Sequence, residues 1–262
     1  MDSSNPIGLF DSGVGGLTVM SEVVKALPNE HILYLGDTAH LPYGNKSPSA
    51  IIRFAIENAN FLMRQKIKLL IISCHTACAH AIDILQTLLP IPVLGVRDPG
   101  FCDLLQATRT KRVAVLATAS TIASGTFQTL LQAEKLHVYP IACPLFVPFV
   151  EEGLQNHAAA KLIAEYYLSS LKGTGIDVAL LACTHYPLLS TVIQEVLGTE
   201  VRLIEPAHST AQMAAQLLKE RNLLNPSTSS PIYRFFASDD PEKFRRLAKI
   251  FFPFPIEKVE LV

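Results

Sequence analysis

Two short segments constrain the fold of this chain more than any other feature. Residues 68–76 (KLLIISCHT) and 177–185 (DVALLACTH) each contain an apolar run, one small residue, a cysteine and then small polar residues. Short runs rich in Val, Leu and Ile are typical of buried strands in a parallel sheet. Cys74 and Cys183 are therefore predicted at the carboxyl ends of two strands, where open α/β sheets bind their ligands.

The residues after each cysteine have the periodicity of a helix. After Cys74, apolar residues recur at helical spacing until Pro90, and after Cys183 a similar stripe lies between Pro187 and Gly198. A thiol at the beginning of a helix lies near the positive end of the helix dipole, which favours the thiolate. Two thiols in equivalent places indicate a pair that acts together.

The order of predicted elements occurs twice along the chain. Strands are expected at residues 7–10, 32–35, 68–73 and 92–96, and again at 113–116, 136–141, 177–182 and 201–204, with helical segments between them. We therefore predict an α/β fold of two similar domains, each with a mostly parallel sheet, that face each other across a central cleft.

The last part of the chain has its own pattern. Residues 208–221 are expected to form a helix, 222–231 a loop, 232–237 a strand and 240–250 a second helix. This tail has too little apolar mass for a core of its own, so we expect it to pack on the first unit. The predicted domains are residues 1–97 with 207–262, on the Cys74 side, and residues 98–206, on the Cys183 side.

Composition excludes several classes of protein. The 262 residues are 49% hydrophobic and carry a net charge of −1, so the chain has material for a core but no basic footprint for nucleic acid. No apolar run reaches the roughly 18–20 residues of a membrane helix, and residues 1–6 do not resemble a signal peptide. Five cysteines are an odd number, which favours reduced thiols and a cytoplasmic protein.

Cys74 and Cys183 also have simpler interpretations. A single cysteine at a strand end is usually a small buried hydrophobic residue, but two in equivalent positions, each followed by Thr and His, favour a function. A disulfide between them would consume both thiols in a reducing compartment. Cys74, Cys78 and His80 lack the paired spacing of a zinc site, so we expect no metal.

The loop at residues 11–16 (DSGVGG) follows the first predicted strand. It lacks the third glycine of a dinucleotide-binding fingerprint and the Lys-Ser/Thr pair of a phosphate-binding P-loop. We interpret it as a turn that exposes Asp11 and Ser12 and offers backbone amides to a small anionic group. A plain helix cap is the alternative role for Asp11.

Further polar residues stand at or just beyond the predicted strand ends. They are Asp37, Tyr43, Gly44, Thr76, Thr118, Thr121 and Thr184. Hydroxyls and amides with little positive charge suit a small zwitterion. Glu151 and His185 could relay protons at Cys183, although a buried His185 bonded to backbone is an equally good interpretation. Two opposed thiols would suit a reaction that removes a proton from one face of a carbon and returns one to the other.

Several motifs in order resemble the bacterial glutamate racemases over almost the whole chain. They are FDSGVGGLT (10–18), GDTA (36–39), PYG (42–44), CPLFVP (143–148) with EEG (151–153), CTHYPLL (183–189) and FFASDDP (235–241). The resemblance implies a racemase that needs no cofactor and interconverts L- and D-glutamate. It also implies a cytoplasmic homodimer, without nucleic acid or membrane partners, that supplies D-glutamate for peptidoglycan synthesis and hence for cell wall biogenesis and cell shape.

The same resemblance implies a role for each matching residue. Cys74 would exchange the α-proton of D-glutamate with help from Asp11, and Cys183 that of L-glutamate with help from Glu151 and His185. The substrate-binding residues would be Asp11, Ser12, Pro42, Tyr43, Gly44, His75, Thr76, Thr118, Thr121, Thr184 and His185.

Among several departures from the family pattern, His75 bears most directly on the substrate. Relatives usually have Cys-Asn-Thr where this chain has Cys74, His75 and Thr76. An asparagine amide both donates and accepts hydrogen bonds, whereas histidine is bulkier and titrates. Two alternatives therefore stay open: a racemase of another acidic amino acid such as aspartate, and a weakly active, racemase-like binding or regulatory protein.

Overall fold

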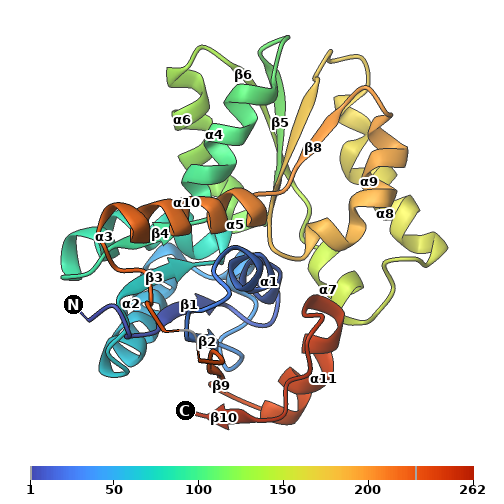
Figure 1. The fold of residues 1–262 in the computed structure, drawn as a ribbon. Coiled ribbons are helices and arrows are strands. Elements are labelled where there is room, and N and C mark those ends of the chain that lie inside the picture. Colours follow the sequence, from blue (N-terminus) through green and yellow to red (C-terminus); the bar gives the residue numbers. More distant parts are fainter. Residues whose placement is uncertain (1, 228) are drawn as a thin grey trace. The chain divides into compact units, whose positions relative to one another are not determined.

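The computed structural model describes residues 2–227 and 229–262, and the chain divides into two compact units. One unit consists of Met1–Val96 and Ala207–Val262, and the other of Arg97–Pro206. Each contains one parallel sheet with helices around it (Figure 1). The predicted α/β class with two parallel sheets is confirmed.

The sheet of the first unit has six parallel strands in the order β10-β9-β2-β1-β3-β4. In chain order the strands are β1 (Ile7–Asp11), β2 (Ile32–Gly36), β3 (Leu69–Ile72), β4 (Val93–Gly95), β9 (Tyr233–Ala237) and β10 (Val259–Leu261). Every residue of β1 and β3 is buried, and Asp11, at the end of β1, is the one charged residue among them. This is expected for inner strands of a parallel sheet. The edge strand β10 was not predicted.

Five helices accompany this sheet: α1 (Leu17–Ala26), α2 (Pro48–Arg64), α3 (His75–Leu88), α10 (Ala207–Glu220) and α11 (Pro241–Phe251). Local sequence explains where two of them begin. The Ser47 hydroxyl accepts the backbone N–H of Ala50 (3.4 Å) before α2, and the Asp240 carboxylate accepts that of Lys243 (2.9 Å) before α11. In both helices a proline occupies the first turn, where it has no hydrogen bond to lose.

The second unit has a four-stranded parallel sheet in the order β6-β5-β7-β8. The strands are β5 (Arg112–Ala117), β6 (His137–Ala142), β7 (Val178–Ala182) and β8 (Arg202–Ile204). The helices are α4 (Arg97–Ala107), α5 (Ala119–Ala123), α6 (Thr126–Ala133), α7 (Phe146–Glu151), α8 (Ala158–Leu168) and α9 (Ser190–Leu197). The helices α4 and α7 were not predicted.

The two sheets share an arrangement of four strands. The order β2-β1-β3-β4 of the first unit corresponds to β6-β5-β7-β8 of the second. Cys74 follows β3 and Cys183 follows β7, so each cysteine stands at the carboxyl end of the same strand of the repeat. The predicted repetition of elements is therefore confirmed at the level of sheet topology.

The segment after Cys183 differs from the predicted helix. A short 3₁₀ helix, η3 (Tyr186–Leu189), comes first, and α9 begins only at Ser190. The Tyr186 hydroxyl, which is fully buried, donates to the backbone carbonyl of Cys143 (2.8 Å). Cys183 is therefore not a helix cap, in contrast to Cys74.

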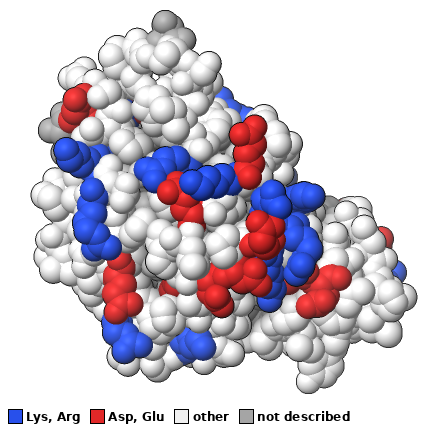
Figure 2. Space-filling model, turned by 90° about the horizontal axis from the view of Figure 1, so that it is seen from below, with Lys and Arg blue, Asp and Glu red and all other residues white. Residues whose placement is uncertain are grey.

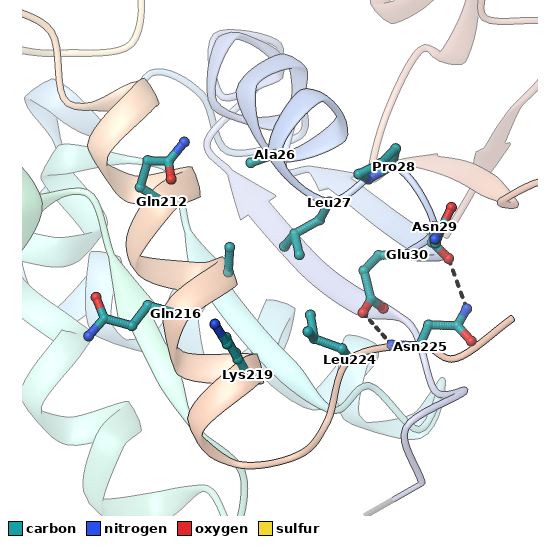
Figure 3. A pocket seen from close by; sticks show the side chains of 11 residues that line it. Ala26, Leu27, Pro28, Asn29, Glu30, Gln212, Gln216, Lys219, Leu224 and Asn225 are labelled. Carbon is teal, nitrogen blue, oxygen red and sulfur yellow. Dashed lines mark hydrogen bonds between the residues drawn. The ribbon is translucent and has the colours of Figure 1, made fainter. Parts of the chain in front are cut away.

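A cavity of about 540 Å³ lies in the first unit between the end of α1 and the second half of α10 (Figure 3). Its lining includes Glu30 and Asn225, whose backbone N–H donates to the Glu30 carboxylate (2.8 Å). Glu30 precedes β2 and Asn225 precedes β9, so both lie at the opposite end of the sheet from Cys74. Glu30 also forms a fully buried ion pair with Lys68 (2.5 Å).

Figure 2 shows the charged side chains on one face of the molecule. On the face shown in Figure 2, Lys and Arg side chains alternate with Asp and Glu, without a large patch of one sign. Within residues 2–227 and 229–262, no helix combines the length and the apolar character that a membrane span requires.

Candidate functional site

Cys74 occupies the position between β3 and α3, with 6% of its surface exposed. It is the residue that caps α3, and its Sγ accepts the backbone N–H of Ala77 at 3.5 Å. The thiol also lies 3.8 Å from the Ser12 hydroxyl, to which it can donate. The turn after β1 and the turn after β3 therefore meet at this thiol, because β1 and β3 are neighbours in the sheet.

The pKa of Cys74 is shifted in the direction opposite to the sequence prediction, which was that the helix dipole favours the thiolate. Burial and the negative charge of Asp11 together raise the pKa of the Cys74 thiol to about 12. The Ala77 amide at the start of α3 lowers it, as expected for a helix terminus, but this contribution is smaller than the cost of desolvation. At neutral pH this group is therefore a thiol, and another group must take its proton before Cys74 can act as a base.

Asp11 ends β1 and is completely buried. Its Oδ1 accepts the backbone N–H of Gly13 at 2.9 Å, whereas the residue at the start of α1 is Gly16, without a side-chain cap. The interpretation of Asp11 as a plain helix cap is therefore wrong. A Cβ at Gly16 would lie 2.3 Å from the Ser73 hydroxyl and 2.7 Å from Asp11 Cβ, so only glycine fits this close approach.

His75 is the first residue of α3 and is buried beside Cys74. Burial lowers the pKa of its imidazole to about 3, from an ordinary value of 6.5. The ring is therefore neutral at physiological pH and adds no positive charge beside the thiol. Thr76 follows it and is buried as well.

The burial of His75 predicts an acid-sensitive stability. The folded state disfavours protonation, whereas the unfolded chain takes up a proton near pH 6.5, so the free energy of unfolding falls as the pH drops through the range between the two pKa values. The slope approaches about 1.4 kcal/mol per pH unit, which gives about 2 kcal/mol between pH 7.5 and 5.0. Urea unfolding at both pH values should show a smaller acid loss for His75→Asn. Equal losses in the two proteins would contradict the prediction.

Pro42, Tyr43 and Gly44 form the loop after β2, where the short 3₁₀ helix η1 (Tyr43–Asn45) begins. The Leu41–Pro42 peptide bond is cis, and Tyr43 is buried. Burial raises the pKa of Tyr43, with further contributions from Asp37 and, more weakly, from the neighbouring Cys74. Ser12, Tyr43 and Cys74, predicted as site residues from three separate motifs, are thus neighbours in the first unit.

In the second unit Cys183 follows β7 directly, with 8% of its surface exposed. Two residues later, His185 Nε2 lies 3.0 Å from Oε1 of Glu151, the last residue of α7. The other ring nitrogen is 3.5 Å from the Thr184 hydroxyl. His185 is therefore paired with a carboxylate beside the second cysteine. Glu152, the next residue along the chain, is exposed.

Thr118 and Thr121 lie at the carboxyl end of β5, the strand next to β7. Thr118 caps α5 by accepting the backbone N–H of Thr121 at 3.4 Å, and their hydroxyl oxygens are 3.0 Å apart. Thr121 is fully buried and Thr118 is 8% exposed. A pair of hydroxyls therefore stands at the same sheet edge as Cys183.

Sequence reasoning missed the support around the Tyr43 loop. His40, Asn58 and Ser238 are hydrogen-bonded to Asp37 or Tyr43, but none of them was predicted as a site residue. Among the described residues, no group of three or more His, Cys, Asp or Glu side chains is placed to hold a metal ion.

Comparisons with known proteins agree with the geometry. Residues 7–214 match the family described as Asp/Glu/Hydantoin racemase. The chain is 44% identical to the glutamate racemase of Chlorobaculum tepidum, over 100% of this chain and 97% of that protein. It is 45% identical to the glutamate racemase of Geobacter metallireducens, over 94% and 92% of the two chains.

Solved structures give the same result. The crystal structure of glutamate racemase from Francisella tularensis in complex with D-glutamate superposes with a TM-score of 0.94 and 39% identity, over 99% of this chain and 98% of that one. The enzyme from Thermus thermophilus, in complex with β-chloro-D-alanine, has a TM-score of 0.92 and 39% identity, over 100% and 98%. The resemblance to bacterial glutamate racemases is confirmed, and the chain belongs to the Asp/Glu/Hydantoin racemase family.

Proposed function

We propose that this protein is a glutamate racemase that interconverts L- and D-glutamate without a cofactor. One observation carries the proposal: a cysteine stands at the carboxyl end of the corresponding strand, β3 or β7, in each of two sheets of the same topology. Relatives that are 44–45% identical bear the name glutamate racemase, and a neighbouring structure contains D-glutamate.

The chemistry needs one thiolate and one thiol at the start of each turnover. The thiolate removes the α-proton, and the thiol donates a proton to the other face of the same carbon, so their protonation states are exchanged at the end. We assign Cys74 to D-glutamate and Cys183 to L-glutamate. Since burial keeps Cys74 protonated at neutral pH, the Asp11 carboxylate is the group assigned to take up its proton.

A different pair of residues is assigned to exchange protons with the second thiol, Cys183. The Glu151–His185 pair lies beside Cys183, and a carboxylate that accepts from one ring nitrogen fixes the tautomer of the imidazole. His185 can then exchange a proton with Cys183 while Glu151 stabilises the charged form of the ring. A carboxylate is therefore assigned to exchange protons with Cys74, and an imidazole with Cys183.

We assign small polar groups of both units to substrate binding. In the first unit these are Asp11, Ser12, Pro42, Tyr43, Gly44, His75 and Thr76, and in the second unit Thr118, Thr121, Thr184 and His185. Hydroxyls and backbone amides hold the two carboxylates and the ammonium group of glutamate without placing a strong positive charge beside the thiols. We further propose a cytoplasmic homodimer whose D-glutamate enters peptidoglycan synthesis.

The test is α-proton exchange in D₂O, followed by NMR, with L- or D-glutamate as substrate and optical rotation recorded in parallel. Neither pyridoxal phosphate nor metal is added, and aspartate is run as the matched substrate that is one methylene shorter. Deuterium incorporation coupled to inversion of glutamate is the expected result. Turnover of aspartate alone would reassign the substrate, and inactivity toward both with free thiols would overturn the proposal.

A further inference from the structure

The Asp37 carboxylate is a buried acceptor of three side-chain hydrogen bonds. It follows β2, and only 2% of its surface is exposed. His40 Nδ1 lies 2.8 Å from Oδ1, the Ser238 hydroxyl donates to Oδ1 at 2.7 Å, and the Tyr43 hydroxyl donates to Oδ2. A carboxylate can only accept, so the His40 ring carries its proton on Nδ1. These three donors hold the Asp37 carboxylate within the protein, where its exposed surface is almost zero.

The Tyr43 hydroxyl also has its hydrogen bonds within the protein. It donates its one proton to Asp37 and accepts from Asn58 Nδ2 at 3.0 Å, and Tyr43 is only 1% exposed. Burial and the nearby charge of Asp37 raise the pKa of Tyr43 well above its ordinary value. The phenol is therefore an anchor, and what residues 42–44 can offer a substrate is their backbone.

The network also joins the carboxyl-terminal part of the chain to this loop. β9 pairs with β2, and Gly36 is opposite Ala237, so the two loops leave the sheet side by side. Besides the Ser238 contact with Asp37, the Thr38 hydroxyl donates to the backbone carbonyl of Asp239 (2.5 Å) and accepts its N–H (2.8 Å). Ser238, in the connection between β9 and α11, therefore holds the Asp37 carboxylate in place. Asp37 in turn accepts the hydrogen bond from Tyr43.

We infer that Asp37 is a positioning residue for substrate binding, which holds the Pro42–Gly44 backbone beside Cys74 through the Tyr43 phenol and is itself held by Ser238. The inference rests on the proposed function, because it assigns Tyr43 and Gly44 to the substrate. It concerns binding rather than proton transfer, since the side-chain hydrogen bonds described for Asp37 go to His40, Tyr43 and Ser238 and not to Cys74. Loss of the carboxylate should therefore raise KM for both enantiomers and leave kcat nearly unchanged.

A double-mutant cycle in KM tests this inference. Asp37→Asn and Tyr43→Phe are each expected to raise KM for D- and L-glutamate about tenfold or more, the size expected for a lost hydrogen bond to a charged group. The double variant should be no worse than the more affected single variant, because Asp37→Asn removes the charge from the same contact that Tyr43→Phe removes entirely. Asp83→Asn removes an exposed carboxylate of the same unit and should leave KM unchanged.

Two further measurements keep the outcome decisive. If Asp37→Asn fails to fold, Tyr43→Phe and Ser238→Ala still test the chain of contacts, and a normal KM in both would overturn the inference. Additive effects on KM, or a loss of kcat alone, would also overturn it. The rise in Tm caused by D-glutamate is a readout independent of turnover. A wild-type protein that is stabilised by D-glutamate but does not racemise it would refute the proposed function alone.

Discussion

Cys74→Ala and Cys183→Ala are each expected to reduce racemisation of glutamate by about 10²–10⁴-fold, the usual contribution of a general acid or base. Each turnover needs both thiols, so neither can replace the other. Any α-proton exchange that remains should be confined to D-glutamate in Cys183→Ala and to L-glutamate in Cys74→Ala. The measurement is NMR of each enantiomer separately in D₂O, combined with optical rotation.

The matched control is Cys102→Ala, which removes an exposed thiol of α4 outside the candidate site. It should racemise glutamate at the wild-type rate. Circular dichroism and urea unfolding of the variants separate a chemical effect from a folding defect. If the wild-type protein racemises glutamate and either Cys74→Ala or Cys183→Ala does so at the same rate, the two-thiol mechanism is contradicted.

Lys68→Met is expected to destabilise the protein by about 3–5 kcal/mol, the cost of leaving one partner of a buried ion pair without the other. Lys68 and Glu30 are 0% and 2% exposed, their charged atoms are 2.5 Å apart, and Lys68 also donates to the Ser3 carbonyl. Burial lowers the pKa of Lys68, whereas the Glu30 charge opposes this effect. The measurement is the free energy of unfolding in urea at pH 7.5.

The double variant Lys68→Met/Glu30→Gln distinguishes the cause of the loss. It removes both charges but keeps a side-chain oxygen that can accept the backbone N–H of Asn225. Most of the stability should return, because no uncompensated charge remains buried. If the double variant is as unstable as Lys68→Met, the loss comes from packing instead. The site is at the other end of the sheet, so the KM for glutamate should not change.

Short-range sequence patterns predict many of the strands, the start of α2 and the residues at the strand ends. The apolar run before Cys74 is a strand because its residues suit a surface buried on both sides, and proline and a capping serine determine where α2 begins. Motif residues such as Ser12, Cys74, Thr118 and Thr121 lie just beyond the ends of strands, so parallel topology brings them to the same edge within each unit. The two-unit α/β class could be predicted for the same reason, since one order of elements occurs twice.

Only the tertiary structure decided the remaining features, because they depend on contacts between residues far apart in the chain. Asp37 meets Ser238 across 201 residues, and Glu30 meets Asn225 across 195, and no local pattern encodes either pairing. The acidity of Cys74 could not be predicted from its place before α3 alone. A helix terminus acts locally and lowers the pKa, but burial and the charge of Asp11 come from the packed sheet and outweigh it.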